Sequence, residues 1–267
     1  MIGRQAQSSR KRFTASVRPA LTAAGILVAL VLTAGYVALA PPEPLPDFGE
    51  IEDISARKQA FFEYLAPVVA AENQRVLHQR ERLVELADRL QAGERLAWLD
   101  WRWLGRLAEE YDVDWERDDR LESVAMLERR VDAVPVSLAL VQAATESGWG
   151  RSRFAVEGNN LFGHWCYRRG CGLVPERRNT GAAHEVAAFD SVSASVRRYL
   201  HNLNTHAAYA PLRAIRARLR DNGESPSAMA LADGLTRYSE RREEYVDEIK
   251  TVIRVNRPII EKVRETL

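Results

Sequence analysis

The feature that most constrains this chain is a stretch of twenty residues without a charge, at positions 21–40. A helix of this length spans about 30 Å, the thickness of the hydrocarbon core of a bilayer. Five basic residues and no acidic residue precede it, which favours a cytoplasmic N-terminus. We therefore expect a basic cytoplasmic segment over residues 1–20, a transmembrane signal anchor over 21–40, and export of everything that follows.

A cleaved signal peptide is the alternative for this stretch, because Ala38-Leu39-Ala40 has the A-x-A form of a cleavage site. The apolar run is long for a signal peptide, and Pro41 would follow the cut directly, so the anchor is favoured. Residues 41–50 begin with PPEPLP and are expected to form an extended spacer. Both routes predict the same compartment for the residues that follow, the periplasm of a bacterium.

The charge balance divides at the same place. The chain has a formal net charge of +1, from 38 basic and 37 acidic residues, and five of the basic residues lie before position 20. The exported part therefore carries 33 basic (38 − 5) and 37 acidic residues, a net charge of −4. This acidic surface argues against nucleic acid as a partner. With 46% hydrophobic residues, the chain is also not a disordered protein.

The first exported part, residues 51–130, is predicted to be a helical segment. Apolar residues recur every seven positions, which indicates a helix over 54–91 with Pro67 as a kink or the start of a second part: Phe62, Val69, Val76, Leu83, Leu90. A second helix is expected over 94–110 in a tryptophan-rich stretch. These tryptophans either pack between helices, which is favoured, or form sugar-stacking platforms.

The second part, residues 131–267, begins with a helix after Pro135 that is apolar almost all round and is therefore expected to be buried. This helix ends at Glu146, with Gly148 as the stop. A carboxyl at the end of a buried apolar helix is partly desolvated, which raises its pKa toward the range of a general acid. The alternative is a terminal glutamate that turns to solvent.

Turn formers at 179–181 are flanked by the apolar pair 173–174 and by the segment 184–187, which predicts a short β-hairpin. Helical patterns return at 193–206, 210–222, 226–235 and 243–265. We therefore expect an α+β fold that is mostly α, with a small β-hairpin.

Residues 139–165 carry the most specific motif: Glu146-Ser147-Gly148-Trp149-Gly150, then Ser152, then Asn159-Asn160-Leu161-Phe162-Gly163. This string resembles the glucosaminidase domain of bacterial peptidoglycan hydrolases, glycoside hydrolase family 73. Further motifs resemble its Bax-like members: Trp165-Cys166 with Cys171-Gly172, Phe189-Asp190-Ser191-Val192, and Arg237-Tyr238-Ser239-Glu240-Arg241. The resemblance implies a lysozyme-like fold that cleaves β-1,4 bonds after N-acetylglucosamine in peptidoglycan, with Glu146 as the acid.

The resemblance also implies a second carboxylate on the hairpin, about a dozen residues before Phe189. Counting back reaches Glu176, with Glu185 as its rival and Glu157 and Asp190 as weaker candidates. The 2-acetamido group of the sugar can replace this carboxylate as nucleophile.

Tyr238 stands where the family carries an active-site tyrosine, and it is expected to orient the acetamido group or stabilise positive charge. Trp149, Asn160 and Phe162 are predicted to line the glycan groove, with Phe162 as a possible core residue. Tyr209 and Tyr245 are expected to line the cleft or to be structural rather than catalytic.

Cys166 and Cys171 are five positions apart around a turn, and in an oxidising compartment a disulfide is favoured. Together with His164 and His184 they can instead form a zinc site, but the spacing is not that of a standard finger. We expect neither a metal nor an organic cofactor.

The function predicted from the sequence is therefore an endo-β-N-acetylglucosaminidase that acts on peptidoglycan glycan strands and is anchored in the inner membrane, with no nucleic-acid partner. A muramidase or lytic transglycosylase is the enzymatic alternative. A non-catalytic peptidoglycan-binding protein is the alternative of another class.

Overall fold

The computed structural model describes residues 44–115, 119–176 and 184–267. The predicted cytoplasmic segment, the predicted membrane anchor and the first three residues of the spacer lie outside these ranges. Within the described ranges, none of the helices has the length and apolar character that crossing a membrane requires.

Helix α2 (Ile54–Gln91) is the longest element, and its bounds are those predicted from the heptad pattern. It begins at Asp53, whose carboxylate accepts a hydrogen bond from the backbone N–H of Ala56 at 2.7 Å. The helix continues through Pro67 as one element. Its first half contributes Phe61, Leu65 and other residues to a large core, and its second half contributes Leu83 and Leu86 to a smaller one.

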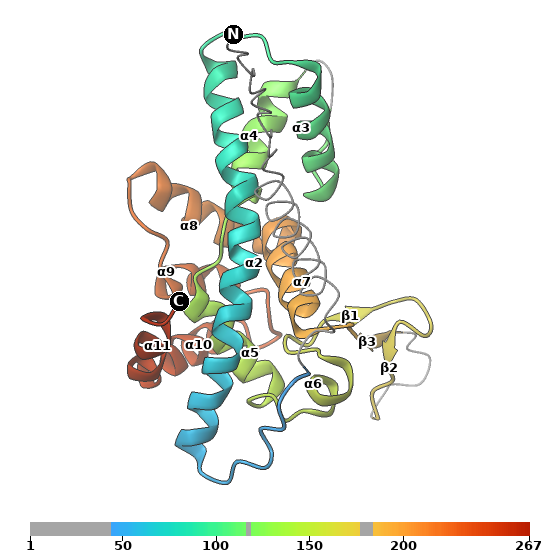
Figure 1. Cartoon of the computed structure of the whole chain (residues 1–267), viewed down its shortest axis with the longest axis vertical. Helices are drawn as coiled ribbons and strands as arrows, with labels where there is room; N and C mark the ends of the chain where they lie inside the picture. The colour runs from blue at the N-terminus through green and yellow to red at the C-terminus, as the bar shows by residue number, and fades with distance from the viewer. Residues whose placement is uncertain (1–43, 116–118, 177–183) are drawn as a thin grey trace, which may run out of the picture. The chain divides into compact units, whose positions relative to one another are not determined.

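The smaller core lies between the second half of α2 and two short helices, α3 (Trp98–Glu110) and α4 (Arg120–Arg130). Figure 1 shows both helices beside this half of α2. Trp101, Trp103 and Trp115 pack against this core, whereas Trp98 is exposed, so three of these four tryptophans support the interpretation as packing residues.

The larger core gathers the remaining helices around α5 (Val136–Ser147), which contacts α2, α9 (Ala228–Ala232) and α10 (Glu243–Val255). The other helices are α6 (Arg153–Gly158), α7 (Val192–Thr205), α8 (Ala210–Asp221) and α11 (Arg257–Arg264), with 3₁₀ turns at Ala207–Tyr209 and Asp233–Leu235. The prediction of one helix over 243–265 is wrong. The helix ends at Val255 and restarts at Arg257, because Pro258 fits only in the first turn of a helix.

A three-stranded antiparallel sheet forms the β part, with the order β1-β3-β2. The strands are β1 (Trp165–Cys166), β2 (Gly172–Leu173) and β3 (Glu185–Ala187). The predicted pairing of the segments at 173–174 and 184–187 corresponds to β2 and β3, and its proposed turn residues lie outside the described residues. The prediction missed β1, a strand of only two residues that periodicity cannot reveal. The fold is mostly helical with a small antiparallel sheet.

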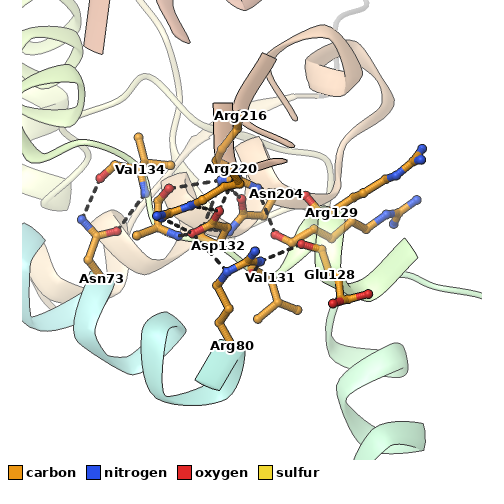
Figure 2. Close-up of polar contacts among 12 residues, drawn as sticks. Asn73, Arg80, Glu128, Arg129, Val131, Asp132, Val134, Asn204, Arg216 and Arg220 are labelled. Carbon is orange, nitrogen blue, oxygen red and sulfur yellow. Dashed lines mark hydrogen bonds and ion pairs between the residues drawn. The ribbon is translucent and has the colours of Figure 1, made fainter. Parts of the chain in front are cut away.

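A buried polar cluster around Asp132 joins the two cores (Figure 2). Asp132 follows α4, and its carboxylate accepts two hydrogen bonds from Arg220 of α8, at 3.0 and 3.1 Å. The fully buried Arg216 donates to the carbonyl oxygens of Arg129 and Arg130, which end α4. Carbonyl groups at the end of α4 therefore accept hydrogen bonds from a side chain of α8.

Asn73 of α2 sets the start of α5. Its side-chain amide donates to the carbonyl oxygen of Val134 at 2.8 Å and accepts from the N–H of Val134 at 3.0 Å (Figure 2). This reciprocal pair fixes the chain two residues before α5 begins. The helical segment and the predicted second domain therefore share α2, which positions the helix that carries Glu146.

Candidate active site

Helix α5 ends in a backbone turn that brings its last residues against α2. Gly148, Trp149 and Gly150 all have positive φ angles of 58°, 62° and 77°. A Cβ atom on Gly150 would lie 2.6 Å from the ring of Phe48, so no larger residue fits. The hydroxyl of Ser147 accepts from the N–H of Gly150 at 2.8 Å and donates to the carbonyl oxygen of Ala143 at 2.6 Å. The motif after Glu146 is thus a helix stop with a fixed geometry.

The Asn-Asn-Leu-Phe-Gly motif forms a second fixed loop. Asn159 ends α6 with a φ angle of 50°. The buried Asn160 side chain donates to the carbonyl oxygens of His164 and Ala187, at 2.9 and 2.8 Å, and accepts from the N–H of His164 at 3.1 Å. Asn160 therefore connects the loop to β3.

The two loops meet at Gly163, the last residue of this motif. Gly163 has a φ angle of 67°, and a Cβ atom placed on it would lie 3.8 Å from Oε2 of Glu146. Gly163 is itself exposed. Its missing side chain leaves room on the Oε2 side of the carboxyl group.

The other oxygen of Glu146 faces a buried group of tyrosines. The hydroxyl of Tyr245, from α10, donates to Oε1 at 2.8 Å. The ring of Tyr238 stacks on that of Tyr245 with an interplanar angle of 5° and 5.4 Å between centroids. The hydroxyl of Tyr238 donates to the carbonyl oxygen of Phe162 at 3.2 Å. Tyr238 thus links the tyrosine group to the second loop.

Burial raises the pKa of Glu146, and the negative charge of Glu248 acts in the same direction. The hydrogen bond from Tyr245 and the positive charge of Arg241 oppose this shift without cancelling it. Arg241 is also ion-paired with Glu248, which offsets part of its charge. The C-terminal end of α5 carries a partial negative charge that further disfavours the carboxylate. Glu146 therefore has the environment of a general acid.

Comparisons with known proteins identify the family of this chain. A model of the glucosaminidase family, described as mannosyl-glycoprotein endo-beta-N-acetylglucosaminidase, matches residues 122–257. The chain belongs to this glucosaminidase family. Over 218 residues it is 32% identical to Protein bax of Escherichia coli (strain K12), which covers 81% of this chain and 76% of that protein. Among solved structures, none matches at a significant level.

Membership of the glucosaminidase family implies a glycosidase that binds a glycan. The match includes both loop motifs and Glu146. It also begins before α5, in α4, so the matched part draws on the helical segment that precedes the predicted domain boundary at residue 131.

Glu176, the predicted second carboxylate of the glucosaminidase site, lies on the surface. Its side chain is 83% exposed and its carboxylate lies 3.9 Å from Nε of Arg153. Arg153 is also paired with Glu157, at 3.8 Å. The structure therefore places both glutamates beside one arginine of α6.

The rival candidate Glu185 is buried on β3. Its two carboxylate oxygens accept hydrogen bonds from the N–H groups of Gly170 and Gly172, at 3.0 and 2.9 Å. These bonds hold the loop between β1 and β2. The structure thus gives Glu185 a role in holding this loop, and Asp190 is exposed before α7.

The predicted groove residues of the glucosaminidase occupy different surroundings. Trp149 packs against Phe61 and Phe62 of α2, at 5.9 and 5.2 Å between centroids. Phe162 is buried and stacks on Tyr199 at 4.0 Å, as its alternative interpretation as a core residue predicted. Tyr209 is buried and packs against Tyr238, and burial raises its pKa to about 12.

Cys166 and Cys171 are joined by a disulfide bond. The thiolates that the zinc alternative requires are therefore absent from the structure. His184 stacks on Trp165 at 4.0 Å, and burial lowers the pKa of His164 to about 4. In the described part of the chain, Nε2 of His164 has no hydrogen-bond partner, and this neutral, half-buried ring lies beside Phe162 and Phe189.

Sequence reasoning underestimated Tyr245, which contacts the candidate acid directly, and missed Gln142 and Tyr199 behind it. The spacing of Gln142 and Glu146 on one helix face was the available signal. The contacts of Glu146 with Tyr245 and of Gln142 with Tyr199 join residues 99 and 57 positions apart, which no local pattern reveals.

Proposed function

We propose that this protein is an endo-β-N-acetylglucosaminidase that cleaves β-1,4 bonds after N-acetylglucosamine in the glycan strands of peptidoglycan. The observation that carries the proposal is Glu146. Its carboxyl is half-buried at the end of an apolar helix, its pKa is raised, and its Oε2 faces the open side left by Gly163. The family match and the resemblance of the motifs to peptidoglycan hydrolases supply the substrate class.

In the proposed reaction, Glu146 transfers its proton to the glycosidic oxygen while the bond between C1 and that oxygen breaks. Positive charge develops at C1 and on the ring oxygen. Water then adds to C1, and its proton passes to a carboxylate. Glu176 serves as that second carboxylate, unless the 2-acetamido oxygen of the sugar attacks C1 first.

Tyr238 is proposed to steady the sugar. Burial raises its pKa well above the usual value, so the hydroxyl stays neutral at any working pH. Its hydrogen bond to the carbonyl oxygen of Phe162 fixes the ring beside the loop that reaches Glu146. We place the active domain in the periplasm, with residues 21–40 as its anchor in the inner membrane.

The test is the variant Glu146→Gln, which has nearly the same shape and can still accept the hydrogen bond of Tyr245. It should fold normally but lose about 10²–10⁴-fold in the release of new reducing ends from purified cell wall. Wild-type activity in this variant would refute the assignment of the acid. Mass spectrometry of the wild-type products should show reducing N-acetylglucosamine ends. Anhydromuramic ends would instead indicate a lytic transglycosylase, and binding without turnover a non-catalytic protein.

A further inference from the structure

Behind Glu146 lies a chain of hydrogen bonds between three buried side chains. The hydroxyl of Tyr199 donates to Oε1 of Gln142 at 2.7 Å. Nε2 of Gln142 donates to the hydroxyl oxygen of Tyr245 at 3.0 Å. Tyr245 in turn donates to Oε1 of Glu146 at 2.8 Å. All three of these residues are buried, so water does not compete for their polar groups.

The chemistry of these groups allows only one donor-to-acceptor order along this series of hydrogen bonds. An amide oxygen has no proton, so Tyr199 must be the donor toward Gln142. An amide nitrogen accepts no hydrogen bond, so Gln142 must donate to Tyr245. A phenol has a single proton, and the oxygen of Tyr245 already accepts from Gln142. The proton of Tyr245 is therefore left to point at Glu146.

A fixed donor at Oε1 decides where the acid carries its own proton. A proton on Oε1 would face the proton of Tyr245, so the protonated form of Glu146 carries it on Oε2. This oxygen lies beside Gly163, where a Cβ atom would lie 3.8 Å from it and where no Cβ is present. The aromatic stack of Tyr199 on Phe162, at 4.0 Å, holds the far end of the chain in place.

We propose that Gln142 and Tyr199 are positioning residues that lock the hydroxyl of Tyr245 as a donor to Oε1 of Glu146, and so reserve Oε2 for the proton that the acid transfers. The part of this proposal that concerns proton transfer to the substrate rests on the proposed function. The direction of the hydrogen bonds from Tyr199 to Glu146, and their effect on the Glu146 carboxyl, do not depend on the identity of the substrate.

The experiment compares Tyr245→Phe and Tyr199→Phe with the wild type. Tyr245→Phe removes the donor to Glu146, and Tyr199→Phe frees the amide of Gln142 to rotate and accept from Tyr245 instead. Both changes keep the aromatic ring, which makes them safer for folding than a substitution at Gln142. The measurements are kcat, KM and the pH dependence of kcat/KM on purified peptidoglycan, and the pKa of Glu146 from an NMR titration.

Tyr245→Phe should move the pKa of Glu146, and with it the alkaline limb of the kcat/KM profile, upward by about one pH unit. Tyr199→Phe should shift both in the same direction by less. In both variants kcat should fall several-fold while KM stays within about twofold, because we expect neither hydroxyl to touch the substrate.

Tyr111→Phe is the matched control. Tyr111 is a buried tyrosine of the smaller core whose hydroxyl also donates to a glutamine, Gln79, at 2.7 Å. It should lose a similar amount of stability without any change in kcat or in the alkaline limb. If Tyr199→Phe behaves like this control, the positioning role is refuted. If Glu146→Gln stays active while the pKa of Glu146 shifts in Tyr245→Phe and Tyr199→Phe, the proposed function fails. The positioning role of the hydrogen bonds then still stands.

Discussion

Two glutamates, the buried Glu72 on α2 and the half-buried Glu146 on α5, have opposite electrostatic environments. Glu72 accepts two hydrogen bonds from Arg197, both at 2.9 Å, and one from Ser193 at 2.5 Å. Burial acts to raise the pKa of Glu72, but these bonds outweigh it and the pKa is lowered. Glu146 receives the hydrogen bond of a neutral phenol, and burial raises its pKa. The hydrogen-bond partners therefore outweigh the effect of burial on the pKa at Glu72 and oppose it only in part at Glu146.

The largest expected effect on stability is that of Glu72→Gln. This variant leaves the guanidinium of Arg197 without its buried anion, so the free energy of unfolding should fall by about 1–3 kcal/mol. Activity per folded molecule should not change. Urea unfolding at pH 7 measures the loss, with Glu63→Gln at an exposed position of the same helix as the control. A variant as stable as the wild type would show that the ion pair does not hold α7 on α2.

Glu146→Gln should change stability in the opposite direction and by less. The pKa of Glu146 is higher in the folded than in the unfolded state, so the unfolded state releases its proton first as the pH rises. Wild-type stability therefore falls between the unfolded pKa, about 4.3, and the folded pKa, and the neutral glutamine avoids this loss.

Thermal unfolding of both proteins across the pH range measures this difference. The glutamine variant should have the higher Tm at pH 7, and the gap should close below about pH 4, where both side chains are neutral. A variant that is less stable than the wild type at pH 7 would mean that Glu146 is a stabilised anion like Glu72. The proposed contrast between the two glutamates would then be wrong.

The sequence predicts the position of Glu146 because this position depends on nearby residues, which start and stop the helix. An apolar helix that begins after Pro135 and stops at Gly148 places this carboxyl at a buried end whatever packs around it. The bounds of α2 were predictable for the same reason, since its heptad pattern and its N-cap Asp53 are continuous in the sequence.

The partners of these glutamates were not predictable, since they come from distant segments. Arg197 lies 125 positions after Glu72, and Tyr245 lies 99 positions after Glu146. The sequence could not decide between Glu176 and Glu185 as the second carboxylate for a related reason. A charged residue on a short strand gives no sign of which face it occupies, and the structure alone shows that Glu185 points toward the backbone of its own loop.

Glu176→Gln should have the smallest effect on stability, because the side chain is 83% exposed and its contact with Arg153 spans 3.9 Å. We expect the free energy of unfolding to change by less than about 0.5 kcal/mol. As the proposed second carboxylate, however, Glu176 should matter for kcat, which should fall at least tenfold on purified peptidoglycan. Glu157→Gln is the matched control, since Glu157 pairs with the same arginine, and its kcat should not change. An unchanged kcat in Glu176→Gln would assign the attack at C1 to the acetamido group of the sugar and leave Glu146 as the only protein carboxyl that the reaction needs.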